Sequence, residues 1–432
     1  MDKKIFRLAV PNIISNITVP LLGMIDMFIV GHLSSELYIG AIAIAVMIFN
    51  LMYWSFSFLR MGTSGFTAQA YGAGDMQEVV HVLLRSLLVA LGGGILLILF
   101  QYFILEIALY FIQGSKEVLQ LASQYFYIYV WAAPAVLGMY AFMGWFIGMQ
   151  DAKTPMYVSI AVNVVNIVCS LFLVFVLKWE LKGVALGSAI AQVVGVLLCL
   201  FVWLTKYKEL KKYIHGKFIR NLSDLSSFFK VNSNIFLRTL CIIIVSTFFT
   251  SASAQFGDLN LAVNSLMMQL FILFSYMMDG FAYAAEALTG RFVGAKDRES
   301  LQQLLKRLFV WGITFALLFT GVYALFSKGI LGLLTDKESV LELANEYITW
   351  VLLIPIASFS AFLWDGIFIG MTASREMRDS MFIAMVFFFV IYYSTRGALG
   401  NNALWMAFVS YLAMRGVMQA FIFSKIKRRI GL

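Results

Sequence analysis

The chain has 432 residues, of which 61% are hydrophobic and 13% are charged, and its formal net charge is +9. Soluble domains carry about 25% charged residues, so this composition excludes a soluble globular protein. Hydrophobic runs of about 20 residues recur along the whole chain, which predicts an all-α integral membrane protein with many spans rather than a membrane β-barrel.

Hydropathy and loop punctuation predict twelve transmembrane helices. They are expected at residues 8–31, 37–60, 80–104, 121–148, 156–177, 183–205, 231–255, 261–289, 302–326, 343–371, 380–396 and 402–424. The first apolar run lacks a small-residue cleavage site, so we expect it to be a retained span and not a signal peptide.

The positive charge is explained by membrane topology, and no nucleic-acid partner is expected. Lys and Arg gather before the first span, between spans six and seven, after span eight and at the end of the chain. All these segments fall on one side, which the positive-inside rule assigns to the cytoplasm. We therefore expect a multi-pass protein of a bacterial inner membrane with both termini cytoplasmic.

Two halves of six spans each are similar to one another. Gly72-Ala73-Gly74-Asp75 matches Gly294-Ala295-Lys296-Asp297, and Phe146-Ile147-Gly148-Met149 matches Phe368-Ile369-Gly370-Met371, each at a separation of 222 residues. We expect an N-terminal lobe at 1–205, a basic cytoplasmic linker at 206–230 and a C-terminal lobe at 231–432. With an even number of spans per half, the two pseudo-symmetric lobes share one orientation and enclose a substrate cavity.

The first span carries Asp26 in an otherwise apolar stretch that Pro11 and Pro20 interrupt. A carboxylate within a membrane is costly and usually faces a cavity. There its pKa would rise toward neutrality, so that it could exchange a proton for a cationic substrate, which is the basis of antiport. The prolines would let the helix bend. The alternative is an acid capped by neighbouring polar groups that serves helix packing alone.

Span five supplies Asn163 and Asn166, which share a helical face because they are three residues apart. Their amides could hydrogen-bond Asp26 or a substrate, or could join helices.

The second half contains three intramembrane acids, Asp279, Glu286 and Asp365, and one arginine, Arg238. Asp279 and Glu286 lie near one helical face because they are seven residues apart. Arg238 in span seven could pair with one of them. The result would be either a structural ion pair or a second coupling site. Arg60, Arg85 and Arg415 lie near the inner ends of spans and are expected to extend to the membrane surface.

No metal site or cofactor is expected. The histidines lie far apart, and the cysteines Cys169, Cys199 and Cys241 lie within apolar helices. Twenty-two methionines and 16% aromatic residues would suit an adaptable pocket. A membrane enzyme would need clustered His, Asp or Glu residues at the interface, and the sequence shows no such cluster.

Several longer motifs are specific enough to indicate a family. They are VPLLGMIDMFIVGHL, FNLMYWSFSFLRMGTSGFTAQAYGAGD, WFIGMQDAKTP, MMDGFAYAAEALTGRFVGAKD and FLWDGIFIGMTASREMRDSM. Together they resemble the DinF-like branch of the MATE multidrug exporters over almost the whole chain. The resemblance implies two lobes with alternating access that exchange organic, often cationic, compounds for protons or sodium ions. It also implies that Asp26 couples the cation, that Pro11 marks the bend and that Asn166 joins the polar cluster.

One position departs from the family pattern. Members often carry an acid one turn after the asparagine, where this chain has Ser170. Residues 231–255 also lack the acid of the NorM-like sodium site, although Asp365 matches its span-ten member. Because a hard cation prefers several oxygen ligands and carboxylate charge, the sequence favours protons.

We therefore predict a monomeric, proton-coupled exporter of small organic compounds, not an enzyme, with Asp26, Asn163, Asn166 and Ser170 in its substrate cavity. The alternative in the same superfamily is a flippase of lipid-linked saccharides. Such a flippase would present several basic groups to a pyrophosphate, whereas the basic residues here cluster at the cytoplasmic ends.

Overall fold

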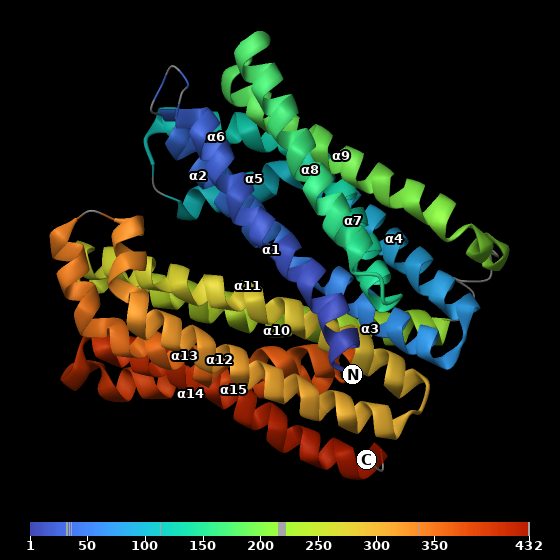
Figure 1. Cartoon of the computed structure of the whole chain (residues 1–432). Helices are drawn as coiled ribbons and strands as arrows, with labels where there is room; N and C mark the ends of the chain where they lie inside the picture. The colour runs from blue at the N-terminus through green and yellow to red at the C-terminus, as the bar shows by residue number, and fades with distance from the viewer. Residues whose placement is uncertain are drawn as a thin grey trace. The chain divides into compact units, whose positions relative to one another are not determined.

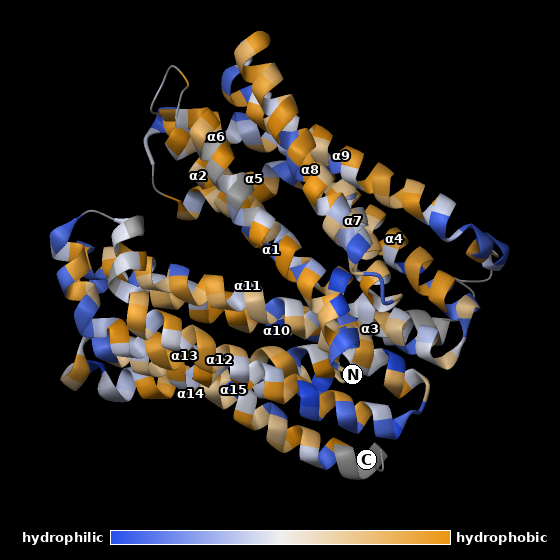
Figure 2. Cartoon of the chain, in the orientation of Figure 1, coloured by the Kyte–Doolittle hydropathy of each residue, from blue (hydrophilic) through white to orange (hydrophobic). Residues whose placement is uncertain are grey.

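The computed structural model is all-helical in the residues that it describes, which are 1–31, 33, 35, 37–112, 114–214, 222–335 and 337–430. Eleven helices in this part of the chain are long and apolar enough to cross a membrane. The 30-residue helix α1 (Asp2–Gly31) covers the remaining expected span. Hydrophobic residues dominate these helices along their lengths (Figure 2). The expected all-α membrane fold is confirmed.

The first half of the chain contains more helical segments than expected spans. After α1 come α2 (Leu37–Ser55), α3 (Phe58–Ala73), α4 (Met76–Leu99), α5 (Gln101–Phe111), α6 (Lys116–Tyr129), η1 (Val130–Ala132), α7 (Ala133–Gly148), α8 (Lys153–Leu171), η2 (Phe172–Val176), α9 (Glu180–Lys206) and η3 (Lys208–Tyr213). The span expected at 121–148 is divided into α6, η1 and α7. A proline in the first turn of α7 explains the division, because its missing N–H is tolerated only there.

The second half consists of six long helices, which lie roughly side by side in Figure 1. They are α10 (Leu222–Gln255), α11 (Asp258–Gly294), α12 (Arg298–Leu334), α13 (Glu338–Gly370), α14 (Ser374–Leu399) and α15 (Asn401–Ile430). The helix α10 already begins within the segment expected to be a linker.

The chain forms two compact units. One contains residues 1–13 and 230–432, and the other contains residues 14–229. The boundary at residue 13 falls inside α1, two residues after Pro11. The first turns of α1 therefore pack with the helices of the second half.

A glycine allows the start of α1 to approach α11 closely. A Cβ atom at Gly280 would lie 2.3 Å from Cγ1 of Ile13 and 2.9 Å from the backbone oxygen of Ala9. Around this crossing Phe6 packs edge-on against Phe281 and Trp311. The side chain of Asn12 donates to the backbone oxygen of Leu8 at 2.8 Å, in the turn that Pro11 interrupts.

Equivalent close contacts occur in both units at the separation of 222 residues. A Cβ atom at Gly144 would lie 2.2 Å from the backbone oxygen of Arg60, and one at Gly366 would lie 2.2 Å from that of Ala282. In each unit the glycine lets two helices cross at backbone contact.

The tight turns after these helices repeat as well. Gln150 and Thr372 both have left-handed φ angles, of 64° and 54°. Asp75 and Asp297 both cap the helix that follows, by accepting a hydrogen bond from a backbone N–H three residues later. The repeat seen in two short motifs thus extends to crossings, turns and caps.

Candidate functional site

The candidate coupling residue Asp26 lies in the last part of α1. Its side chain falls outside the part of the structure that is described, so its contacts remain an expectation. Of the two prolines expected to bend α1, Pro11 is buried and Pro20 is exposed.

Polar contacts join α1 to α8 within the unit of residues 14–229. The hydroxyls of Ser15 and Ser159 are 3.0 Å apart. One turn further along both helices, Nδ2 of Asn163 donates to the backbone oxygen of Thr18 at 3.3 Å. Because residue numbers rise together on the two helices, α1 and α8 run parallel in this region. Asn163 is thus engaged with α1, as one of its two expected roles requires.

Asn166 belongs to a fully buried polar cluster between α8 and α9. Its Nδ2 donates to the hydroxyl of Ser188 at 3.0 Å, and the hydroxyl of Ser170 lies 3.4 Å from its Oδ1. The three side chains are at most 5% exposed. A Cβ atom at Gly187 would lie 2.4 Å from Oγ of Ser170, so only glycine there leaves room for this hydroxyl. We call Asn166, Ser170 and Ser188 the α8–α9 polar cluster.

Ser188 was not among the expected site residues. The adjacent small pair Gly187-Ser188 in an apolar span is the signal that would have found it, because small and hydroxyl residues mark close helix contacts in membranes.

In the other unit, Asp365 near the end of α13 is held by three side chains. Arg238 from α10 forms an ion pair with Oδ2, and Nη2 of Arg415 from α15 donates to the same oxygen at 2.8 Å. Nε2 of Gln419, one turn after Arg415, donates to Oδ1 at 2.6 Å. All four residues are at most 7% exposed. We call them the Asp365 cluster.

Two expectations for the second half need correction. Arg238 could have paired with Asp279 or Glu286, but its carboxylate partner is Asp365. Helical spacing alone showed which acids share a face of α11, but not that α10, α13 and α15 meet at one point. Arg415 was expected to extend to the membrane surface, but it is 5% exposed because Asp365 binds it inside the bundle.

Arg85 also differs from the expectation that it would extend to the surface. It is only 4% exposed, and its guanidinium forms two hydrogen bonds to Glu78, at 2.7 and 3.1 Å. Glu78 and Arg85 are seven residues apart and lie on one face of α4. This bidentate ion pair balances the charge of the guanidinium, so Arg85 does not need to reach the lipid headgroups.

The two remaining acids of α11 lie in different environments. Asp279 is half-buried and close enough to Arg415 to attract its charge, whereas Glu286 is 1% exposed. Over the described ranges no group of three or more His, Cys, Asp or Glu residues could hold a metal ion.

Comparison with known proteins identifies the family. The family model MatE matches residues 11–172 and 235–394. DNA damage-inducible protein F of Escherichia coli is 36% identical over 426 residues, which cover 98% of this chain and 92% of that protein. The chain belongs to the MATE family of transporters. The expected DinF-like resemblance is confirmed, and the family comprises transporters and not enzymes.

More distant relatives agree with this assignment. A probable multidrug resistance protein NorM of Photorhabdus laumondii is 20% identical and covers 87% of this chain and 83% of that protein. A crystal structure of a MATE protein in the bent conformation has a TM-score of 0.88 at 19% identity, covering 100% of this chain and 97% of that one. An outward-facing multidrug resistance MATE transporter of the MOP superfamily has a TM-score of 0.85 at 19% identity, covering 99% and 96%.

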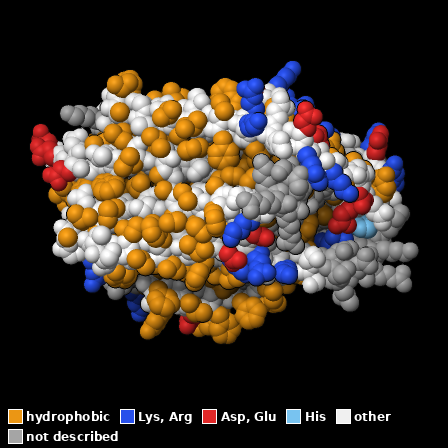
Figure 3. All heavy atoms as spheres, turned by 90° about the horizontal axis from the view of Figure 1, so that it is seen from below, with side chains coloured by type: hydrophobic (Ala, Val, Ile, Leu, Met, Phe, Trp, Pro, Cys, Tyr) orange, Lys and Arg blue, Asp and Glu red, His pale blue; other side chains and the backbone are white. Residues whose placement is uncertain are grey.

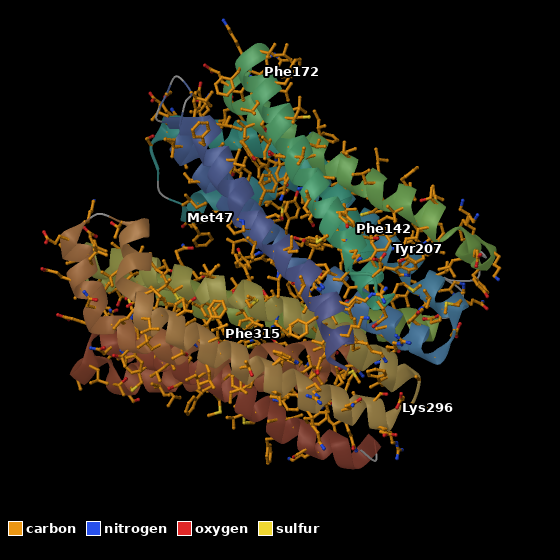
Figure 4. All side chains as sticks on the ribbon, viewed as in Figure 1. Met47, Phe142, Phe172, Tyr207, Lys296 and Phe315 are labelled. Carbon is orange, nitrogen blue, oxygen red and sulfur yellow. The ribbon has the colours of Figure 1, made fainter. Side chains whose placement is uncertain are left out.

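A further polar cluster of this MATE transporter lies outside the membrane-spanning segments, at the turn between α7 and α8. The Asp151 carboxylate accepts hydrogen bonds from Nζ of Lys206 at 2.6 Å, the hydroxyl of Tyr207 at 2.9 Å and the hydroxyl of Thr154 at 2.6 Å. The Tyr207 ring, labelled in Figure 4, packs edge-on against Trp145 and lies against Phe146 of α7. The cluster fastens the end of α9 to the start of α8.

We expect the Asp151 cluster to stabilise the protein in a pH-dependent way. Burial alone would raise the pKa of Asp151, but hydrogen bonds from Lys206, Thr154 and Tyr207 outweigh it and lower the pKa below its ordinary value. Because the folded pKa is lowered, the stabilisation is fully present above the unfolded pKa of about 3.9 and is lost as the pH falls through the folded pKa.

The variant Asp151→Asn tests this prediction. Its melting temperature in detergent should be lower than that of the parent protein near neutral pH, and the difference should shrink once the pH falls below about 4. A difference that is the same at all pH values would contradict the role of the carboxylate charge. Asp297→Asn is the comparison variant, because the half-buried Asp297 also caps a helix, α12, but its carboxylate accepts hydrogen bonds from Ser300 and is attracted by Lys4 without a cluster of the Asp151 kind.

Proposed function

We propose that this MATE transporter is a proton-coupled antiporter that exports small organic, often cationic, compounds by alternating access. Asp26 is the group that exchanges a proton for the substrate. The observation that carries the proposal is the parallel packing of α1 on α8 beside the α8–α9 polar cluster, which supplies polar groups at the depth where Asp26 is expected.

The register of the two helices supports this placement. Asn163 contacts the backbone of Thr18, and from this contact Ser170 lies seven residues along α8 while Asp26 lies eight residues along α1. At a rise of 1.5 Å per residue these separations correspond to about 10 and 12 Å along parallel axes. Asp26 and Ser170 therefore come to similar heights. We place the substrate cavity beside Asp26 at this level, with the buried Asn166 and Ser170 behind its wall and Asn163 about two turns away along α8.

The composition of the polar cluster favours protons over sodium ions. Its groups are one amide and two hydroxyls, so Asp26 would be the one carboxylate in the proposed cavity. A sodium site wants several oxygen ligands and usually more negative charge. A single carboxylate can still bind and release a proton.

The Asp365 cluster supports coupling in the first half and not in the second. Two arginines and a glutamine occupy both oxygens of Asp365. A proton would have to displace these bonds, so we assign the cluster a structural role. The charge of Asp365 balances one of the two buried guanidinium groups, and nearby Asp279 attracts the other.

We place the hinge, the point at which α1 would bend during transport, at the unit boundary in α1. Pro11 lacks the backbone N–H that would complete the helical ladder, and the boundary follows two residues later. Protonation of Asp26 from outside would favour bending of α1 and release of the substrate. By the positive-inside rule we assign both termini to the cytoplasm. Figure 3 shows Lys and Arg side chains mainly toward one end of the face in view.

Transport in proteoliposomes with separate ion gradients tests the proposal. An organic cation dye is the substrate probe, and either a proton or a sodium gradient is imposed across the membrane. We expect a proton gradient to drive dye transport without sodium, and a sodium gradient at equal pH to drive none. Sodium-driven transport that a protonophore does not reduce would overturn the assignment of the coupling ion.

A further inference from the structure

A hollow lies between α6 and α9, near the start of α9, in the unit of residues 14–229. The part nearer the start of α9, which we call the mouth, is a cavity of about 640 Å³. An adjoining cavity of about 500 Å³ continues along the two helices and forms the lower part. Ile128 and Leu186 line both parts, so the two form one surface feature. We call it the α6–α9 groove.

The groove is apolar along its length and basic at its mouth. Tyr127, Trp131 and Val193 line the lower part, and each is at least 38% exposed. Lys178 and Lys182 line the mouth, and both are exposed.

One acid, Glu180, also lines the mouth and offsets part of the positive charge of the two lysines. Glu180 accepts a hydrogen bond from the hydroxyl of Tyr38 at 2.5 Å. Neither Lys178 nor Lys182 has an ion-pair partner among the residues that the structure describes. With Lys178, Glu180 and Lys182 together, the mouth carries a net positive charge above an apolar channel.

The second half shows that the lysine at the turn is not required by the fold. Lys178 has a φ of 57°, and the residue 222 positions later, Gly400, has a φ of 53°. Glycine adopts this left-handed conformation at the least cost. Lys178 thus adopts a conformation that costs a lysine more than a glycine, and the turn itself does not require its side chain.

Larger side chains stand in the second half at three positions that line the groove, whereas Tyr127 and Trp131 correspond to the smaller Thr349 and Leu353. Ile128 corresponds to Trp350, Leu186 to Phe408 and Ala189 to Tyr411. The indole of Trp350 donates to Oδ1 of Asn402 at 2.8 Å, and Asn402 is the counterpart of Glu180. Lys182 is replaced by the buried Leu404. The first half therefore has two lysines, and an open space beside the smaller side chains, that the second half lacks at the equivalent positions.

We propose that the α6–α9 groove binds an anionic phospholipid. The phosphate lies between Lys178 and Lys182, and an acyl chain lies along Tyr127, Trp131 and Val193. Charge complementarity selects an anionic headgroup, and the exposed Trp179 beside the lysines suits the level of the headgroups. The expected topology puts this end outside, where basic residues are otherwise scarce, so the lipid belongs to the outer leaflet.

Lipid titration of the delipidated full-length protein, followed by native mass spectrometry, tests the site. The probe is phosphatidylglycerol, with phosphatidylcholine as the zwitterionic comparison. We expect Lys178→Gln/Lys182→Gln to weaken phosphatidylglycerol binding roughly 30-fold, since two basic residues near an anionic headgroup together contribute about 2 kcal/mol. Lys116→Gln is the matched control, because Lys116 is exposed at the start of α6 but does not line the groove.

A second variant tests the apolar part without changing charge. Ile128→Trp introduces the residue that the second half carries at the equivalent position, and it should displace the acyl chain and weaken binding. This variant decides the question if the lysine variant does not fold. Unchanged phosphatidylglycerol binding in either folded variant, equal binding of phosphatidylcholine by the parent protein, or competition by free inorganic phosphate would each overturn the proposal. None of these results depends on the coupling ion.

Discussion

Replacement of Asp26 by asparagine is expected to abolish proton-driven export while leaving the protein folded. Asparagine has nearly the same size and can keep hydrogen bonds to neighbouring polar groups, but it cannot ionise. The exchange of a proton for the substrate would then have no carrier, because the α8–α9 polar cluster contains only an amide and hydroxyls. Dye export in energised vesicles should fall to the level of vesicles without the transporter.

Asn163→Ala is an informative comparison for this experiment. It removes the amide that donates to the backbone of Thr18 but leaves the carboxylate of Asp26 in place. We expect reduced export that still depends on the proton gradient. Unchanged export by Asp26→Asn would show that another group carries the proton. Loss of folding in that variant, measured by its melting temperature, would show a structural role for Asp26.

Replacement of Asp365 by asparagine is expected to act mainly on stability. The change leaves Arg238 and Arg415 buried without the carboxylate that binds both, and removal of one partner from a buried ion pair costs about 3–5 kcal/mol. The melting temperature should fall clearly. The protein that remains folded should still export dye in response to a proton gradient.

A double variant separates charge balance from other effects of this change. Asp365→Asn combined with Arg238→Met returns the net charge of the cluster to its original value. It should recover part of the lost stability, which is the coupling that a double-mutant cycle measures. Loss of export equal to that of Asp26→Asn, in an Asp365→Asn protein of normal stability, would instead place the coupling site in the second half.

The positions of the spans could be predicted from sequence because lipid requires long apolar helices. Each expected span lies, to within one residue at its ends, inside one helix or two or three consecutive helical segments, as 121–148 does in α6, η1 and α7. The repeat was also recognisable, because glycines such as Gly148 and Gly370 stand where helices cross at backbone contact and no other residue fits.

Side-chain partners could not be predicted in the same way. Hydropathy places Arg238, Asp365 and Arg415 inside spans, but their meeting point depends on how three helices pack, which a single sequence does not contain. The spacing of Arg415 and Gln419 by one turn was the available signal that one face of α15 binds an anion. Ser188 was missed for a similar reason, since its relation to Asn166 depends on the contact between α8 and α9.

Proton release on substrate binding tests the central claim most directly. The purified protein is held in a weakly buffered detergent solution near neutral pH, and an organic cation is added while the pH is recorded. If Asp26 binds either a proton or the substrate, the parent protein should release protons in proportion to the substrate bound, and Asp26→Asn should release none. Substrate binding without proton release by the parent protein, or equal release by the variant, would contradict the account.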